Sequence, residues 1–300
     1  MHLHLFGAAT PSGEAFRQAV AADAGYGPLL LYSRSGRHFG MLHADFNDPS
    51  VFFLGGESGA PGLWISFGPI WMLAPFLEQL AHSHPERLLG LHGVIACSSS
   101  SAITKRFAAN RFDRELVARL TTAEDQLLAT CRMLEVPCRI LRPTLIYGRV
   151  GPYVDRNLSL LLQLMRRLPF LPLPAHSGLR QPIHASQLAA VVLELARQFT
   201  SSGWDPSLPQ RIALGGDSTL SYTEMLRALQ QSLHLGDRAR NCRLLPFTNQ
   251  LFFLFTAPLL LCSPKAYEAV LRMSADLAGF IPSHQLLAEP PQAFPLPDRL

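Results

Sequence analysis

Short apolar runs alternate with amphipathic helical patterns through the first half of the chain. The apolar runs predict six strands, which cover residues 3–6, 29–32, 40–45, 63–67, 93–97 and 139–141. Segments with helical spacing lie between them, at residues 12–22, 71–81 and 113–134. Strands that alternate with helices in this way are typical of a parallel sheet covered on both faces. The sequence therefore predicts an α/β fold with a Rossmann-type doubly wound parallel sheet.

The second half is less regular. Helical patterns occupy residues 157–168, 186–199 and 222–233, and a short apolar run at 212–214 is expected to return to the sheet. Further on, Phe252, Phe253 and Phe255 belong to an apolar helix. We expect these rings to pack within a smaller C-terminal domain; an apolar surface for a membrane or a partner is the alternative.

The segment 7–13 directly follows the first predicted strand and opens the first predicted helix. It reads Gly-Ala-Ala-Thr-Pro-Ser-Gly. A dinucleotide-binding turn needs this context, because its glycines permit a tight turn and the pyrophosphate lies over the helix N-terminus. Thr10 occupies the place of the central glycine in G-x-x-G-x-x-G, where its Cβ narrows the space. The cofactor-binding residues predicted in this turn are Gly7, Ala8, Thr10, Pro11, Ser12 and Gly13.

The end of the second strand indicates which dinucleotide is bound. An acidic residue there would accept a hydrogen bond from the ribose 2′-hydroxyl of NAD, but this chain has Arg34, with Arg37 shortly after it. An arginine suits a 2′-phosphate, so NADP is favoured over NAD; a solvated surface arginine is the alternative. Asp45 could accept from the adenine amine or could simply form a turn.

Other predicted cofactor contacts lie where further strands end, since parallel sheets bind ligands at the carboxyl ends of their strands. These residues are Phe46, Phe67, Gly68 and Ser98.

Composition limits the other function classes. The 300 residues (33.1 kDa) are 48% apolar and 16% charged with a formal charge of +4, which fits one large globular domain or two fused ones. The sequence contains neither a run of 18 apolar residues, which would predict a membrane span, nor a basic N-terminal region, which would predict a signal peptide. We therefore expect a cytoplasmic protein. Arginine-rich runs with interleaved aromatics are absent from the sequence, which argues against nucleic acid. The cysteines and histidines do not have metal-ligand spacing, and no metal is expected.

Several segments, in this order along the chain, resemble the extended short-chain dehydrogenase/reductase superfamily, whose best-known members are NAD-dependent epimerases and dehydratases of nucleotide sugars. They are residues 7–13, Asp45, the serines from Ser98, the Arg-Pro-Thr-Leu-Ile-Tyr-Gly stretch at 142–148, residues 180–184, and residues 212–224. The resemblance implies a Rossmann domain at 1–150 and a smaller substrate-side domain at 151–300, with segments near 180–200 and 210–216 returning to the sheet.

The resemblance also implies a catalytic serine or threonine and a Tyr-x-x-x-Lys pair, but the pair is missing. The corresponding positions hold Val117 and Thr121, and no tyrosine or lysine occurs between Arg106 and Tyr147. The chain is in this respect similar to an atypical branch with a serine-rich stretch followed by Thr-Lys. Ser100 and Lys105 are therefore the predicted catalytic residues, with an exposed loop lysine as the alternative for Lys105.

The substrate-binding residues expected from the resemblance are Ser99, Tyr147 and Arg180, although the Tyr147 ring could instead support its own loop. The implied function is that of an NAD(P)-binding epimerase/dehydratase-like protein that acts on a nucleotide sugar or a lipid-linked sugar by an altered mechanism. The alternative is a catalytically inactive Rossmann protein with a regulatory or scaffold role. Both the enzyme and the inactive Rossmann protein are compatible with a homodimer.

Overall fold

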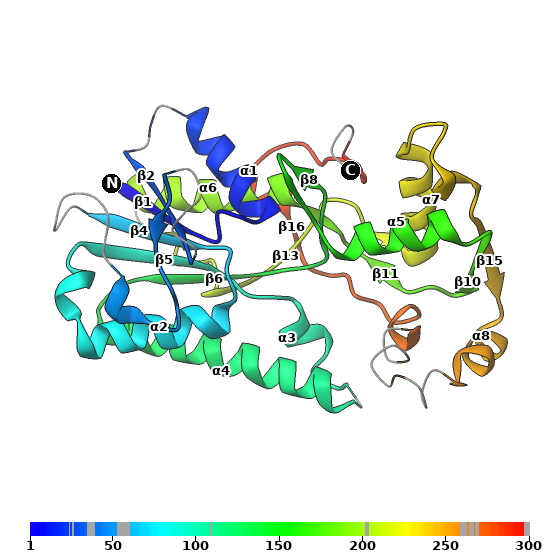
Figure 1. Ribbon diagram of the computed structural model, residues 1–300, viewed down its shortest axis with the longest axis horizontal. Coiled ribbons are helices and arrows are strands. Elements are labelled where there is room, and N and C mark those ends of the chain that lie inside the picture. Colours follow the sequence, from blue (N-terminus) through cyan, green and yellow to red (C-terminus); the bar gives the residue numbers. More distant parts are fainter. Residues whose placement is uncertain are drawn as a thin grey trace.

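A large parallel sheet forms the centre of the molecule (Figure 1). The computed structural model describes residues 1–23, 25, 27–34, 40–52, 61–108, 110–201, 204–258, 263, 267 and 270–296. Eight strands pair in the order β16-β13-β6-β5-β4-β1-β2-β3, and every pairing is parallel. Their bounds are β1 His2–Phe6, β2 Leu29–Ser33, β3 Leu42–His43, β4 Gly62–Ser66, β5 Leu91–Cys97, β6 Cys138–Pro143, β13 Arg211–Gly215 and β16 Ile281–Pro282.

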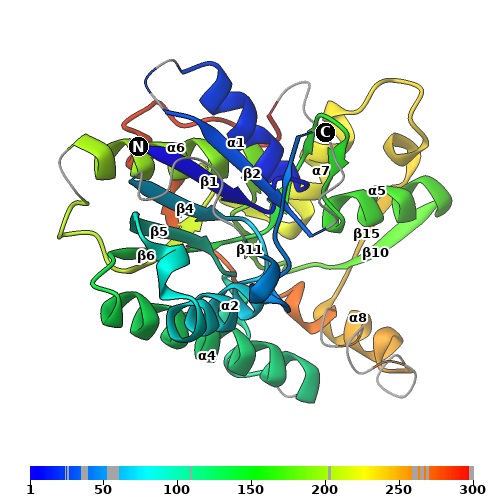
Figure 2. The same ribbon diagram turned by 60° about the vertical axis from the view of Figure 1, so that its left-hand side comes forward.

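Helices cover both faces of this sheet (Figure 2). On one face α1 (Pro11–Ala21) packs against α6 (Ala185–Ser201), and α11 (Ser283–Leu287) lies beside α6. On the other face α2 (Ile70–Ser83) packs against α4 (Arg111–Met133). Each pair shares an apolar core with the strands, because these strands are buried on both sides. The predicted Rossmann-type α/β fold is confirmed.

The third predicted strand is much shorter than residues 40–45. β3 is the edge strand and pairs with β2 only through Leu42 and His43. The chain turns away immediately afterwards, because the Asp45 carboxylate accepts hydrogen bonds from the backbone and side-chain amides of Asn47. The edge of the sheet therefore ends in a turn.

A smaller lobe lies beyond the sheet and contains a third apolar core. Its helices are α5 (Asn157–Arg167), α7 (Tyr222–Ser232) and α8 (Asn249–Thr256). Outside the large sheet, short strands form pairs: β7 (Ile146–Tyr147) with β12 (Ile183–His184), β8 (Arg149–Val150) with β9 (Tyr153–Val154), β10 (Phe170–Pro174) with β15 (Arg243–Phe247), and β11 (Leu179–Arg180) with β14 (Leu220–Ser221). The β8–β9 pair packs against α1, whereas β10 and β15 belong to the smaller lobe. The remaining elements are α3 (Ser101–Thr104), η1 (Pro49–Val51), η2 (Pro85–Leu88) and η3 (Arg238–Asn241).

The strand order places a crevice at the carboxyl ends of β1 and β4. From β1 the chain continues to β2 on one side, and it later returns to β4 on the other side. Ligands of open α/β sheets bind at such a reversal of strand order. Among the helices that the structure describes, none combines the length and the apolar character needed to cross a membrane.

A buried histidine in β1 predicts acid sensitivity. His4 is 1% exposed, and its Nδ1 lies 2.9 Å from the Tyr32 hydroxyl, while Nε2 has no hydrogen-bond partner among the residues that the structure describes. Burial, together with the nearby His2, lowers the pKa of His4 from 6.5 to about 4. Between these pH values the unfolded chain binds more protons than the folded protein, so stability falls as the pH falls from 6.5 to 4.

We expect this group alone to remove about 3 kcal/mol of unfolding free energy at the lower end of that range. Urea unfolding across the range should give a shallower pH dependence for His4→Gln than for the wild type. His82→Gln, at an exposed position in α2, should leave the slope unchanged. Identical slopes for the wild type and His4→Gln would contradict the expectation.

Candidate functional site

The β1–α1 turn is held by one side chain and two glycines. The Thr10 hydroxyl donates to the Gly7 carbonyl (2.8 Å) and accepts from the Gly13 amide (3.0 Å), which makes Thr10 the N-cap of α1. Gly7 has φ +80°, and a Cβ there would lie 2.8 Å from the backbone nitrogen of Gly68. A Cβ at Gly13 would lie 2.3 Å from the Gly7 carbonyl oxygen. The turn thus brings the helix N-terminus and the loop after β4 close together.

A cleft of about 780 Å³ opens at this turn. It is lined by the β1–α1 turn, by residues 67–71 after β4, by Ser98 and Ser99 after β5, and by residues 152–157. The predicted cofactor residues that line it are Gly7, Thr10, Pro11, Ser12, Phe67, Gly68 and Ser98. Ala8 and Gly13 are buried behind the turn and do not line the cleft.

This cleft fits a dinucleotide. Gly7 and Gly68 bring the backbones of the two loops into direct contact, because a Cβ at Gly7 would lie only 2.8 Å from the Gly68 nitrogen. The N-terminus of α1, which carries partial positive charge, faces the cleft through Thr10, Pro11 and Ser12. Arg156 lines the same cleft with a positive charge, and the neighbouring Asp155 carboxylate, which also lines it, accepts from the backbone amides of Gly148 and Leu158. An anionic pyrophosphate is the ligand chemistry that these groups favour.

Three predicted cofactor residues, Arg34, Asp45 and Phe46, are not among the described residues that line the first cleft. Arg34 is exposed, and its guanidinium makes no ion pair with the described residues. Asp45 is occupied by the Asn47 turn, and Phe46 packs on the rings of Phe6 and Phe76. Arg37 lies outside the described residues.

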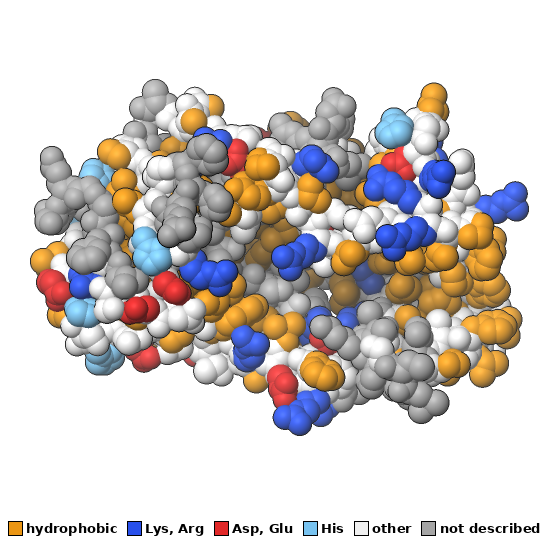
Figure 3. All heavy atoms as spheres, viewed as in Figure 1, with side chains coloured by type: hydrophobic (Ala, Val, Ile, Leu, Met, Phe, Trp, Pro, Cys, Tyr) orange, Lys and Arg blue, Asp and Glu red, His pale blue; other side chains and the backbone are white. Residues whose placement is uncertain are grey.

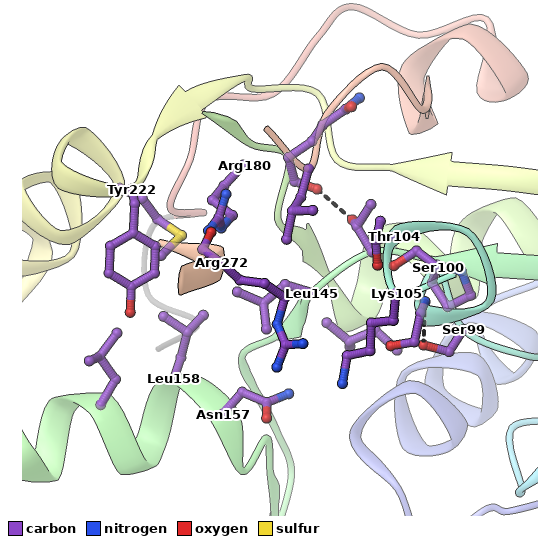
Figure 4. Close-up of a pocket in the computed structure, with 18 of the residues that line it drawn as sticks. Ser99, Ser100, Thr104, Lys105, Leu145, Asn157, Leu158, Arg180, Tyr222 and Arg272 are labelled. Carbon is purple, nitrogen blue, oxygen red and sulfur yellow. Dashed lines mark hydrogen bonds between the residues drawn. The ribbon is translucent and has the colours of Figure 1, made fainter. Parts of the chain in front are cut away.

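A second cleft of about 720 Å³ lies beside the first, between the sheet and the smaller lobe (Figures 3 and 4). The two clefts share Ser98, Ser99, Ile146 and Asn157. The second cleft is also lined by Ser100, Lys105 and Arg180, so the predicted catalytic residues and two predicted substrate residues come together here. A molecule in the second cleft would meet a ligand of the first cleft at the shared residues.

A charge cluster closes one side of the second cleft. Lys105 Nζ lies 2.7 Å from Asp113 Oδ1, and Arg272 Nη1 lies 2.5 Å from Asp113 Oδ2. Asp113 is 2% exposed, so burial by itself would raise the pKa of this carboxyl. Hydrogen bonds from Lys105, Asn110 and Arg272 outweigh that effect and hold the pKa of Asp113 well below its usual range. Asp113 therefore remains ionised and fixes both cations. Figure 4 shows the side chains of Lys105 and Arg272 at the cleft.

Ser98 is tied to a second, buried ion pair. Its hydroxyl lies 2.5 Å from the carboxylate of Glu124, which is fully buried in α4 and also accepts from Arg142 and Arg211. Ser99 Oγ accepts from the Ser101 amide at 3.1 Å. The Ser100 side chain has no hydrogen-bond partner among the described residues, so its hydroxyl is available to a ligand.

The structure does not bring Tyr147 to either cleft. The Tyr147 ring is 1% exposed and lies between His184 and Phe294, and its hydroxyl accepts from the Leu296 amide. Burial raises the pKa of Tyr147 to about 12. Thus Tyr147 supports the packing around its loop, which was the alternative interpretation of the sequence.

Helix α4 presents no acid or base where the resemblance implies the Tyr-x-x-x-Lys pair. Thr121 donates its hydroxyl to the Val117 carbonyl of its own helix (2.9 Å), and Leu120 is the residue of α4 that lines the first cleft. In addition, no group of histidine, cysteine, aspartate or glutamate in the described part of the chain is arranged to hold a metal ion.

Sequence reasoning missed three residues of the second cleft. Arg272, which lies 159 residues after Asp113 in the sequence, lines this cleft together with Asn157 and Tyr222. Burial raises the pKa of Tyr222, although the Arg180 guanidinium 5.3 Å from its ring opposes the shift. Figure 4 shows Tyr222 and Lys105 on opposite sides of the cleft, so they do not replace the missing pair. Of these three residues, only Tyr222 had a signal in the sequence, because it lies in the segment 212–224 that contributes to the family resemblance.

Comparison with solved structures identifies the class of fold. The chain is similar to a UDP-glucuronic acid 4-epimerase from Bacillus cereus in complex with UDP-glucuronic acid and NAD (TM-score 0.63, 13% identity, 98% of this chain and 95% of that chain). It is also similar to a nucleoside-diphosphate-sugar epimerase from Staphylococcus aureus (TM-score 0.58, 16% identity, 98% of each chain). A GDP-mannoheptose C4 reductase from Campylobacter jejuni with NADP bound matches with TM-score 0.60 and 13% identity, over 83% of this chain and 87% of that chain.

These likenesses establish a shared fold. The resemblance to extended short-chain dehydrogenases/reductases that the sequence predicts is confirmed at this level. Neither the models of known protein families nor the curated protein sequences give a match to the chain.

Proposed function

We propose that the protein is an NAD(P)-dependent epimerase or reductase that acts on a sugar linked to a nucleotide or to a lipid. The observation that carries this proposal is the meeting of two clefts at Ser98 and Ser99, one lined by the N-terminus of α1 and the other by Ser100, Lys105 and Arg180. The similar structures described above are an epimerase with NAD and a sugar nucleotide and a reductase with NADP, which supports the proposal.

The residues around the shared wall would have distinct tasks. A nicotinamide bound in the first cleft supplies the hydride acceptor or donor. The hydroxyls of Ser99 and Ser100 would hydrogen-bond the reacting oxygen of the sugar. The Lys105 ammonium, fixed by Asp113, would stabilise negative charge on that oxygen and could donate a proton to it. Arg180 would help to hold the substrate's anionic group.

The alternative, a dinucleotide-binding protein without turnover, is favoured by one observation. α4 directs no ionisable side chain into the first cleft at the place of the usual acid, and a missing acid or base costs about 10²–10⁴-fold in rate. Such a protein would bind the dinucleotide but would not oxidise or reduce any sugar nucleotide or lipid-linked sugar offered to it.

Dinucleotide titration tests the proposal. We expect cofactor-free protein to bind NADPH in the micromolar range and more tightly than NADH, as followed by nicotinamide fluorescence and by the rise in melting temperature. Arg34→Ala should weaken NADPH binding about tenfold and leave NADH binding unchanged, because only NADPH carries the 2′-phosphate. A well-folded protein that binds neither nucleotide would refute the proposed function, and equal loss of both would remove Arg34 from cofactor selection.

A further inference from the structure

Helix α5 has two apolar faces. Leu158, Leu162 and Met165 are buried in the core of the smaller lobe. On another face, Leu160 and Leu164 are 63% and 42% exposed, and together with Leu161 they line the second cleft. A surface helix normally carries polar side chains opposite its buried face. Leu161 also packs, partly buried, against the core of the lobe. The packing of the lobe does not explain Leu160 and Leu164, which we call the α5 stripe.

Exposed apolar side chains continue from the α5 stripe to the outer end of the smaller lobe. Figure 3 shows them gathered over α5, β10, β15 and α8, starting at the hollow of the second cleft. Their elements are contiguous, because β10 pairs with β15 and α8 packs on both. The residues are Leu168, Phe170, Leu245, Leu251, Leu254 and Phe255. Phe252 is buried as expected, whereas Phe255 is 70% exposed. An apolar surface of this extent indicates a binding site.

The inner end of this surface is cationic. Lys105, Arg180 and Arg272 line the second cleft, and no carboxylate is found in its described lining. Asp113, behind the described lining, pairs with both Lys105 and Arg272. Arg180 is 7% exposed, and its guanidinium donates to the carbonyls of Leu179, Arg272 and Ala275, which orient it without cancelling its charge. The described lining of the cleft thus places cationic side chains next to an apolar track.

We propose that the second cleft binds an anionic lipid, with a phosphate or diphosphate at Lys105 and Arg272 and an acyl or isoprenoid chain along the α5 stripe toward α8. This arrangement rests on the proposed function, in which the sugar carried by the phosphate reaches Ser99 at the shared wall. The α5 stripe favours a hydrocarbon over a nucleoside, because leucine side chains leave the polar groups of a base and a ribose without hydrogen bonds.

A chain-length series tests this assignment in the full chain. We expect dodecyl phosphate, kept below its micelle concentration, to bind about 100-fold more tightly than butyl phosphate in calorimetric titrations, because the added methylenes leave water. In the double variant Leu160→Gln/Leu164→Gln, dodecyl phosphate should bind only about tenfold more tightly than butyl phosphate, or less. Leu89→Gln/Leu235→Gln, a matched change at exposed leucines outside the cleft, should keep the full gain. Lys105→Gln should weaken the binding of dodecyl phosphate and the binding of butyl phosphate by a similar factor.

Other outcomes would overturn the proposal. They are equal affinity for the two chain lengths, an equal loss in the control variant, or uridine diphosphate binding that dodecyl phosphate does not displace. A dimer in sedimentation velocity that dissociates in Leu160→Gln/Leu164→Gln, without lipid affinity, would instead assign the surface to a second copy of the chain. NADPH titration of the same proteins separates the two claims. NADPH binding without lipid binding refutes only the lipid site, whereas lipid binding without NADPH binding supports the lipid site and refutes the proposed function.

Discussion

Glu124→Gln is expected to lower the free energy of unfolding by about 3–5 kcal/mol, the largest stability effect of the variants considered. The Glu124 side chain is fully buried and accepts from Ser98 (2.5 Å), Arg142 Nε (3.0 Å) and Arg211 Nε (3.1 Å). An amide in its place leaves the partly buried guanidinium of Arg142 without its carboxylate, and Arg211 keeps only its pair with the exposed Asp125. Its NH₂ group would also face donors where the carboxylate accepted.

Urea unfolding at neutral pH would measure this loss. The adjacent residue supplies a matched control: Asp125 pairs with Arg211 but is 73% exposed, so Asp125→Asn should cost less than about 1 kcal/mol. Similar small losses in the two variants would show that the buried pair contributes no more than a surface pair. A large loss would identify Glu124 as the link that holds α4, β6 and β13 behind the serine segment of the site.

The sheet could be predicted because its signals are local. β1, β4 and β5 are buried on both faces and therefore appear in the sequence as continuous apolar runs. The smaller lobe lacks such signals. Its β10 and β15 contain prolines and exposed residues, and β16 pairs with the sheet through only two residues. Tertiary contacts rather than strand patterning define these elements.

The same distinction divides the candidate site. The β1–α1 turn is specified by a few consecutive residues, so its glycines and the Thr10 position are visible in the sequence. The Asp113 cluster unites α4 with Lys105, 8 residues before Asp113, and with Arg272, 159 residues after it. No pattern within one segment reports that contact. Nor could periodicity distinguish the α5 stripe from core leucines, since both faces of the helix carry the same residue type.

Gly13→Ala is expected to weaken NADPH binding about 100-fold, equivalent to about 2.7 kcal/mol. The new Cβ would lie 2.3 Å from the Gly7 carbonyl oxygen and 2.8 Å from the Ala8 Cα, so backbone rather than a flexible side chain must move. The carbonyl of Gly7 is also the acceptor for Thr10, and its displacement would loosen the cap that fixes the N-terminus of α1. The pyrophosphate would then lose an oriented set of amides and a favourable helix terminus.

Nicotinamide fluorescence titration at equal concentrations of folded protein measures the effect, with Gly236→Ala as the control, because its Cβ would meet nothing closer than 3.5 Å. Should Gly13→Ala not fold, Ala9 gives a second comparison, since it is exposed and lines the same cleft. Ala9→Glu should bind NADPH about tenfold more weakly than the isosteric Ala9→Gln, because only the carboxylate repels a pyrophosphate. Unchanged affinity in Gly13→Ala, or equal affinity in the Ala9 pair, would place the dinucleotide away from the β1–α1 turn. The meeting of the two clefts at Ser98 and Ser99 would then no longer bring a cofactor to the substrate.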